Sequence, residues 1–216
     1  MIKTIARALT AAALALLPLA TTPPAQAAET LSLHDGIEAL PQAAESRDGY
    51  ERTKFKHWID EDRDGCNTRA EVLLAEAVTQ PTLGAGCKIT GGTWRSYYDD
   101  TTVQGPSGLD IDHMVPLAEA WDSGASQWTA ARRQAYANDL GAERSLAAVT
   151  AKSNRSKADQ DPAQWMPPAA DAQCTYLSDW VSTKLRWSLT IDRAERDTLR
   201  QLATGCENTD VEFERV

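Results

Sequence analysis

The chain of 216 residues carries 22 lysine and arginine side chains against 31 aspartate and glutamate side chains, a formal net charge of −9. That length suits one domain with a hydrophobic core. The acidic balance argues against a protein that holds a long polyanion tightly and processively, because such binding depends on neutralising phosphates with basic side chains.

The first 27 residues have the features of a secretory leader. Lys3 and Arg7 give a positive start, residues 8–20 form an apolar run too short to span a bilayer comfortably, and an A-x-A cleavage signal ends at Ala27. We therefore predict a secreted mature chain, residues 28–216, that forms one domain without a membrane anchor. Loss of the two basic residues takes the net charge from −9 to −11.

Two helices are predicted at the start of the mature chain. Residues 31–46 carry Leu33, Ile37 and Leu40 at roughly helical spacing, which favours a short peripheral helix. Residues 50–59 place one stripe of apolar side chains on a second helix, and such stripes more often pack in a core than bind ligands: Tyr50, Phe55, Trp58 and Ile59.

Residues 60–71 fit the calcium-loop pattern D-x-D-x-D-G with a glutamate at the twelfth position. Three carboxylates at alternate positions and a bidentate glutamate are the ligands that a hard cation prefers, and the glycine permits the sharp turn. The ligand set predicted for Ca²⁺ is Asp60, Asp62, Asp64 and Glu71. The alternative is an acidic turn that caps the helix predicted at residues 70–78.

Residues 87–90 and 93–98 are predicted strands, and the Gly91-Gly92 pair between them favours a hairpin. Strand, strand and helix follow in that order between residues 109 and 168, with a helical turn at residues 117–121 and a helix at 129–137. Together these segments predict an α+β fold in which short hairpins are surrounded by helices.

Asp112 and His113 stand side by side on the first of these strands, and Asn154 lies in the helix that follows the second. Carboxylate and amide oxygens suit Mg²⁺ or Mn²⁺, which would neutralise a phosphate, and a histidine suits proton transfer from water near neutral pH. Neighbouring side chains of a strand face opposite sides, so the two residues share a site only where the strand bends or ends. Pro116 indicates that it ends there.

Four cysteines remain in the mature chain, and four allow three pairings. Neighbours in the sequence favour Cys66 with Cys87 and Cys174 with Cys206. The second pair would join two antiparallel helices predicted between residues 173 and 206. A zinc site is disfavoured, because the sequence has no C-x-x-C and no histidine pair at ligand spacing.

Three segments together resemble the HNH, or ββα-metal, nucleases, and in particular their secreted actinobacterial and fungal branch. They are residues 111–125, 137–140 and 154–165, which read IDHMVPLAEAWDSGA, ANDL and NRSKADQDPAQW. The resemblance implies a disulfide-stapled ββα-metal core in which Asp112 and Asn154 bind the metal ion and His113 is the general base.

The resemblance has one departure. Many HNH proteins have an Asn-Leu pair at the start of the second strand, where the asparagine orients the histidine, but here the pair is Ser145-Leu146. Either Asn138 or a backbone carbonyl is expected to hold the imidazole instead. The predicted nucleic-acid contacts are Lys157, Arg155, Arg133 and Arg69, with Arg69 alternatively paired to the loop carboxylates.

These observations favour a secreted, monomeric, metal-dependent endonuclease that cuts DNA with little sequence preference, since nothing in the chain resembles a base-reading module. RNA is a further expected substrate, because the mechanism uses no 2′-hydroxyl group. The alternative is an extracellular binding module that calcium stabilises and in which the HNH-like core is inert.

Overall fold

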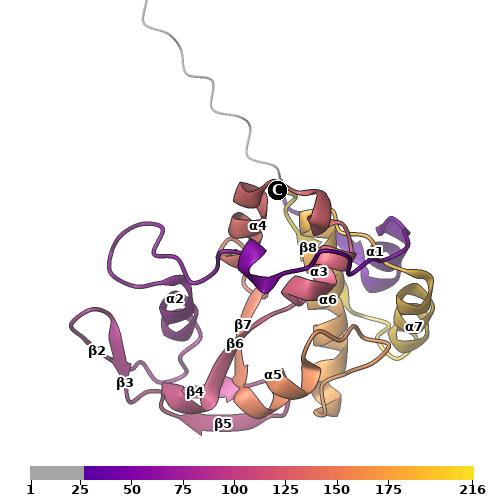
Figure 1. The fold of residues 1–216 in the computed structure, drawn as a ribbon. Coiled ribbons are helices and arrows are strands. Elements are labelled where there is room, and N and C mark those ends of the chain that lie inside the picture. Colours follow the sequence, from indigo (N-terminus) through magenta and orange to yellow (C-terminus); the bar gives the residue numbers. More distant parts are fainter. Residues whose placement is uncertain (1–26) are drawn as a thin grey trace, which may run out of the picture.

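The centre of the fold is an antiparallel pair of strands, β6 (Leu109–His113) and β7 (Leu146–Thr150), which leads directly into helix α5 (Ala151–Lys157). The structure is a computed structural model that describes residues 27–216 (Figure 1). The side chain of Thr150 accepts a hydrogen bond from the amide of Ser153 and so caps the first turn of α5. The predicted strand-strand-helix order is confirmed, whereas the predicted leader lies outside the described residues except for Ala27.

Both faces of this strand pair are covered. One face carries Leu109 and Ile111, which pack with α2 (Thr68–Ala75) and Trp94 in a small apolar cluster. The other face carries the alternate residues of β7, which belong to the larger core around α6 (Gln173–Trp187). Figure 1 shows β6 and β7 between these two helices. The strand pair therefore separates the two cores. Polar side chains on it are buried, so they need hydrogen-bond or ion-pair partners.

The larger core is closed by elements from the two ends of the described chain. Strand β1 (Glu29–Ser32) pairs antiparallel with β8 (Asp210–Phe213), and α1 (Leu33–Ala39) and α7 (Arg193–Ala203) pack beside α6. A disulfide joins Cys174 to Cys206, which confirms the predicted pairing and the predicted pair of tail helices. The β1–β8 pair was not predicted, since its partners are far apart in the sequence.

The smaller side of the molecule holds four short strands and the second disulfide, Cys66–Cys87, which is also the predicted pair. The hairpin predicted around Gly91-Gly92 is wrong. Strand β3 (Lys88–Thr90) pairs with β2 (Thr82–Gly84), and β4 (Thr93–Ser96) pairs with β5 (Thr101–Gln104). The chain turns at the two glycines, but the backbone of Thr93 bonds that of Thr79 and directs β4 away from β3.

The helix predicted for residues 50–59 is also wrong, because only Arg52–Lys54 form a single 3₁₀ turn. Trp58 has φ +57°, a left-handed conformation that ends any right-handed helix. The aromatic stripe nevertheless packs as predicted, with Phe55 fully buried against Tyr136 and Trp121. Here tertiary contacts, and not the local helical pattern, determine the backbone conformation.

Two helices connect β6 to β7. Helix α3 (Leu117–Asp122) follows Pro116, and α4 (Ala130–Ala137) is capped by the side chain of Thr129 as predicted. Three further 3₁₀ turns lie at Pro106–Gly108, Ala125–Gln127 and Ala170–Ala172.

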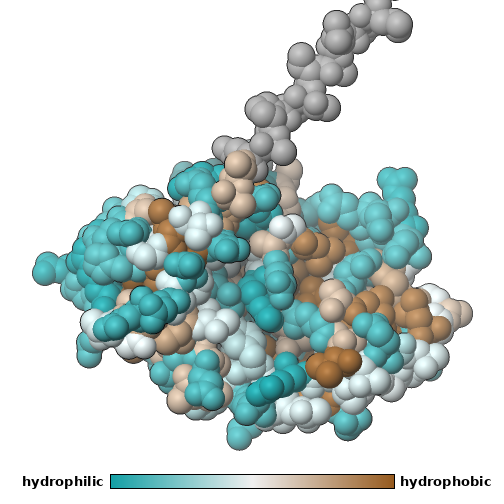
Figure 2. All heavy atoms as spheres, turned by 180° about the vertical axis from the view of Figure 1, so that it is seen from behind, coloured by the Kyte–Doolittle hydropathy of each residue, from teal (hydrophilic) through white to brown (hydrophobic). Residues whose placement is uncertain are grey.

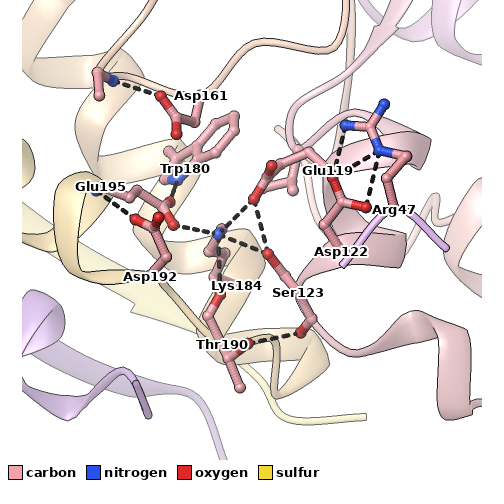
Figure 3. A network of polar contacts seen from close by, with 12 residues as sticks. Arg47, Glu119, Asp122, Ser123, Asp161, Trp180, Lys184, Thr190, Asp192 and Glu195 are labelled. Atoms are coloured by element: carbon pink, nitrogen blue, oxygen red, sulfur yellow. Dashed lines mark hydrogen bonds and ion pairs between the residues drawn. The ribbon is translucent and has the colours of Figure 1, made fainter. Parts of the chain in front are cut away.

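A buried ammonium group ties α3 to the tail helices (Figure 3). Lys184 on α6 donates to Glu119 of α3 at 2.9 Å, to Glu195 of α7 at 2.7 Å and to the hydroxyl of Ser123 at 3.1 Å. The backbone carbonyl of Thr190 accepts a fourth contact at 3.0 Å. This network holds the segment that follows β6 against the larger core.

The outer surface is mostly hydrophilic. Figure 2 shows separate hydrophobic patches among polar atoms on the face opposite that of Figure 1. Large apolar side chains that stand exposed are Val78, Leu83, Leu140 and Val216. Among residues 27–216, no helix is both long enough and apolar enough to cross a membrane.

Candidate active site

Asp112 lies on the face of β6 that looks into the larger core, with 5% of its surface exposed. Its Oδ2 atom accepts hydrogen bonds from the Tyr98 hydroxyl and from Lys157 Nζ, both at 2.6 Å. Its Oδ1 atom has no hydrogen-bond partner among the described residues. Burial raises the pKa of the Asp112 carboxyl, and Lys157 and Tyr98 oppose that shift. One carboxylate oxygen is thus held in place while the other is available as a ligand.

Lys157 is fully buried, and each of its three N–H groups has an acceptor. Besides Asp112, the ammonium donates to the backbone carbonyls of His113 at 3.0 Å and of Met114 at 2.8 Å. Burial lowers the pKa of Lys157, whereas the Asp112 charge opposes this. The predicted contact between Lys157 and nucleic acid does not fit this geometry, because the side chain points inward and fixes the end of β6.

Asn154 on α5 reaches the same face of β6 through Asp110. Its Nδ2 atom donates to Asp110 Oδ2 at 3.2 Å, so its carbonyl oxygen remains free to bind a cation. Asp110 and Asp112 share a face because they are two residues apart in a strand. Sequence reasoning missed Asp110, although this spacing beside Asp112 was a signal for it. Three oxygen donors, from Asp110, Asp112 and Asn154, therefore belong to one side of the strand.

His113 is the last residue of β6 and lies on the opposite face from Asp112. Its Nε2 atom is 3.0 Å from the carbonyl oxygen of Ala137. A carbonyl can only accept, so Nε2 carries the proton and Nδ1 carries the lone pair. Burial lowers the pKa of His113 to about 3, because the charged imidazolium would lose its hydration. The ring is therefore neutral at physiological pH, with its lone pair on Nδ1.

Asn138 does not touch the imidazole. Its side chain accepts from the Ile59 amide at 3.1 Å and from the Thr68 hydroxyl at 2.8 Å, and it donates to the Lys56 carbonyl at 2.7 Å. Of the two expected holders of His113, the structure has the backbone carbonyl, that of Ala137, in contact with the ring. Asn138 instead fastens the segment before the acidic loop.

The predicted basic contacts differ in their availability. Arg155 exposes 76% of its side chain and lies 3.4 Å from Asp110. Arg69 donates to the carbonyl of Leu109 at 3.1 Å, at the start of the same strand. Arg133 instead binds three backbone carbonyls, those of Lys54, Ala125 and Trp128, so its guanidinium is a structural clamp. The prediction that Arg133 faces nucleic acid does not fit that geometry.

The acidic loop brings its carboxylates together. Oxygens of Asp60, Asp62 and Asp64 lie within 4.8 Å of one another, and Glu71 is grouped in the same way with Asp64. Burial and then the charges of the three aspartates raise the pKa of Glu71. A divalent cation would relieve this repulsion, and the three aspartates form one oxygen cluster that Glu71 approaches through Asp64.

Comparison with known proteins gives one family and one relative. The description "GmrSD restriction endonucleases, C-terminal domain" matches residues 70–202, a range that contains β6, β7 and α5. An "Uncharacterized secreted protein" from Arthroderma benhamiae is 40% identical over 190 residues, which cover 88% of this chain and 91% of that protein. No solved structure matches.

The buried ion pair can be tested through Lys157→Met. The substitution leaves the Asp112 carboxylate buried without its counter-charge, and breaking such a pair costs about 3–5 kcal/mol of unfolding free energy. Urea unfolding should show this loss, whereas Lys152→Met, which changes an exposed lysine of the same helix, should unfold close to the parent. Equal midpoints for the two variants would contradict the role given to Lys157.

The acidic loop can be tested by thermal melts with and without Ca²⁺. A ligand present at about a hundredfold excess over its Kd raises the unfolding free energy by about 2.7 kcal/mol. We expect the parent to gain stability on addition of Ca²⁺ and Asp62→Ala to gain little, with Asp171→Ala as the control for loss of an exposed aspartate elsewhere. If Asp62→Ala responds as the parent does, the loop is not a calcium site.

Proposed function

The chain belongs to the family of the GmrSD restriction endonuclease C-terminal domains, and on this basis we propose that it is a secreted, metal-dependent endonuclease with little sequence preference. The family suggests a nuclease and thus a nucleic-acid substrate. One observation carries the finer proposal. At the end of a single strand, free oxygen donors lie on one side and a neutral imidazole with a free Nδ1 lies on the other.

Asp112 and Asn154 would hold Mg²⁺ or Mn²⁺. Both offer an oxygen without a protein partner among the described residues, which is the chemistry that these hard cations prefer. Asp110, which already accepts a hydrogen bond from Asn154, adds a second negative charge on that side. When bound, the cation supplies neutralisation of the phosphate and stabilisation of the leaving oxygen.

His113 would act as the general base. Its Nδ1 atom takes a proton from the attacking water while Nε2 stays bonded to the Ala137 carbonyl. The imidazole needs no prior deprotonation, since its pKa is lowered to about 3 by burial. Water attack requires no 2′-hydroxyl group, so both DNA and RNA are expected substrates, with DNA as the principal one.

Arginines near the strand would contact the phosphates of the substrate. The exposed Arg155 lies beside Asp110, and the half-buried Arg69 of α2 bonds the backbone carbonyl at the start of β6. The net charge, −9 for the full chain and −11 without Lys3 and Arg7, makes the complex transient, because most of the protein repels a polyanion. We propose a monomer that binds, cuts and releases.

The predicted secretion is confirmed by the relative, which is named a secreted protein and is 40% identical over most of both chains. The two disulfides agree with an oxidising compartment. An inert calcium-stabilised binding module would have no need of Asn154 or of a lone-pair nitrogen beside Asp112. The preserved donor set therefore favours the enzyme over that alternative.

Variants of the two kinds of site residue should fail in different ways. His113→Ala removes the base and should lower the cleavage rate by about 10²–10⁴-fold at every Mg²⁺ concentration. Asn154→Ala removes a metal ligand and should shift the Mg²⁺ dependence to higher concentration. Asp112→Asn should act in the same direction. Plasmid nicking by purified protein, with EDTA as the metal-free arm, measures both effects.

Arg200→Ala, which breaks an exposed pair with Glu38, is the control that should leave cleavage unchanged. An RNA transcript of matched sequence tests the second substrate. The proposal fails if His113→Ala cuts plasmid at the rate of the parent, or if EDTA leaves the parent fully active.

The pH profile gives an independent check. A general base works in its deprotonated form, so the rate rises with pH only around the pKa of that base. Because burial lowers the pKa of His113 to about 3, we expect no rise centred near the ordinary histidine value of about 6.5. Initial rates between pH 5 and pH 8 at saturating Mg²⁺ measure this, and a tenfold rise per pH unit below a midpoint near 6.5 would contradict it.

A further inference from the structure

Trp58 has a backbone conformation that aromatic residues rarely adopt. Its φ of +57° lies in the left-handed region, which a bulky side chain disfavours. Residues held in such conformations persist only where their surroundings over-determine them, and they gather at functional sites. The reason for this conformation is therefore to be sought in what holds Trp58 and in what its side chain contacts.

The side chain of Asn138 bonds the backbone on both sides of Trp58. It donates to the carbonyl of Lys56 at 2.7 Å and accepts from the amide of Ile59 at 3.1 Å, so it spans Trp58. Thr68 adds a second fastening, because its amide donates to the Ile59 carbonyl and its hydroxyl donates to Asn138. Asn138 is itself buried at 6% exposure. The tight turn at Trp58 is thus imposed by a rigid, satisfied polar group.

The ring of Trp58 lies against the candidate base. Its centroid is 5.5 Å from that of His113, with 31° between the planes. Tyr136 lies 6.4 Å from the same imidazole at 23°. His57 approaches edge-on at 6.4 Å and is tied back by its Nδ1 to the Phe55 carbonyl. Among the described residues, the imidazole has one hydrogen bond, at Nε2, and aromatic rings around it.

We propose that Trp58 is a positioning residue for His113 and that Asn138 acts on the reaction through Trp58. The inference rests on the proposed function, in which His113 Nδ1 takes the proton from water. A single hydrogen bond at Nε2 leaves the ring free to tilt and to swing about that bond. The Trp58 ring, tilted by 31° against the imidazole with 5.5 Å between the centroids, restricts this freedom and fixes the direction of Nδ1.

This assignment explains how the chain manages with Ser145 where many HNH proteins have an asparagine. The hydrogen bond to the imidazole comes from the Ala137 carbonyl, and the next residue, Asn138, places the tryptophan that covers the ring. Two adjacent residues at the end of α4 therefore orient His113, one directly and one through a contact that sequence spacing does not reveal.

The test compares Trp58→Ala, Trp58→Leu and Trp58→Phe in the full mature chain. Misplacement of a catalytic group by about 1 Å lowers rates by about 100-fold, so kcat should fall about 10- to 100-fold in the alanine and leucine variants. KM should change little, and phenylalanine, which keeps a flat ring, should restore most of kcat. A role in folding alone would change the melting temperature and leave the kcat of folded protein near that of the parent.

Trp94→Phe is the matched control, because Trp94 belongs to the small core against which Trp58 packs but has no ring contact with His113. It should lower the melting temperature and leave kcat unchanged. Asn138→Ala should reduce kcat as Trp58→Ala does. The double variant should be no slower than the worse single one, since residues that act in series are not additive. Additive losses would overturn the assignment of Asn138.

A second readout is independent of activity. The chain has three histidines, so ¹⁵N side-chain NMR resolves each ring. The parent should show His113 as a single Nε2–H tautomer, and Trp58→Ala should show averaging or broadening of that signal while the Trp94→Phe spectrum stays as in the parent. An unchanged His113 signal in Trp58→Ala would overturn the inference. An inactive parent with the expected NMR change would overturn the proposed function but not the positioning by Trp58.

Discussion

The fold around the site depends on one buried ammonium group. Lys157 has no exposure to water, and its three N–H groups are taken by the Asp112 carboxylate and by the carbonyls of His113 and Met114. A buried charge without such partners would be too costly to keep. The same contact therefore neutralises Asp112, joins the end of α5 to the end of β6, and fixes the backbone from which the candidate base projects.

Lys157 fixes the end of β6. Because side chains alternate along this strand, the site residues are divided between its two faces. Asp110 and Asp112 face the helix that carries Asn154, and His113 faces the aromatic rings of Trp58 and Tyr136. Oxygen ligands for a cation and a neutral nitrogen base thus lie on opposite faces of the strand near its end. The division has a physical basis in burial, since the carboxylate side is charged and paired while the imidazole side is apolar and keeps the ring neutral.

The remainder of the chain supports this small unit from both sides. The larger core, closed by the Cys174–Cys206 disulfide and the buried Lys184 network, backs one face. The smaller core, with the Cys66–Cys87 disulfide and the acidic loop, backs the other. Short strands of three to five residues would not be stable alone, and the two disulfides supply part of the missing stability.

The sequence by itself determined the order strand, strand, helix and the two tail helices, because these follow from local periodicity and capping. It favoured the two disulfide pairs among three possible pairings, and its resemblance to HNH nucleases singled out Asp112, His113 and Asn154. Tertiary structure decided what local patterns do not contain. Lys157 and Arg133 have the sequence features of solvated basic residues, yet buried acceptors from distant segments claim them. The helical stripe at residues 50–59 gives way to a turn because Asn138, about 80 residues on, bonds Lys56 and Ile59 across Trp58. The packing of remote segments decides which partner each polar group binds. Local sequence patterns do not predict these long-range contacts.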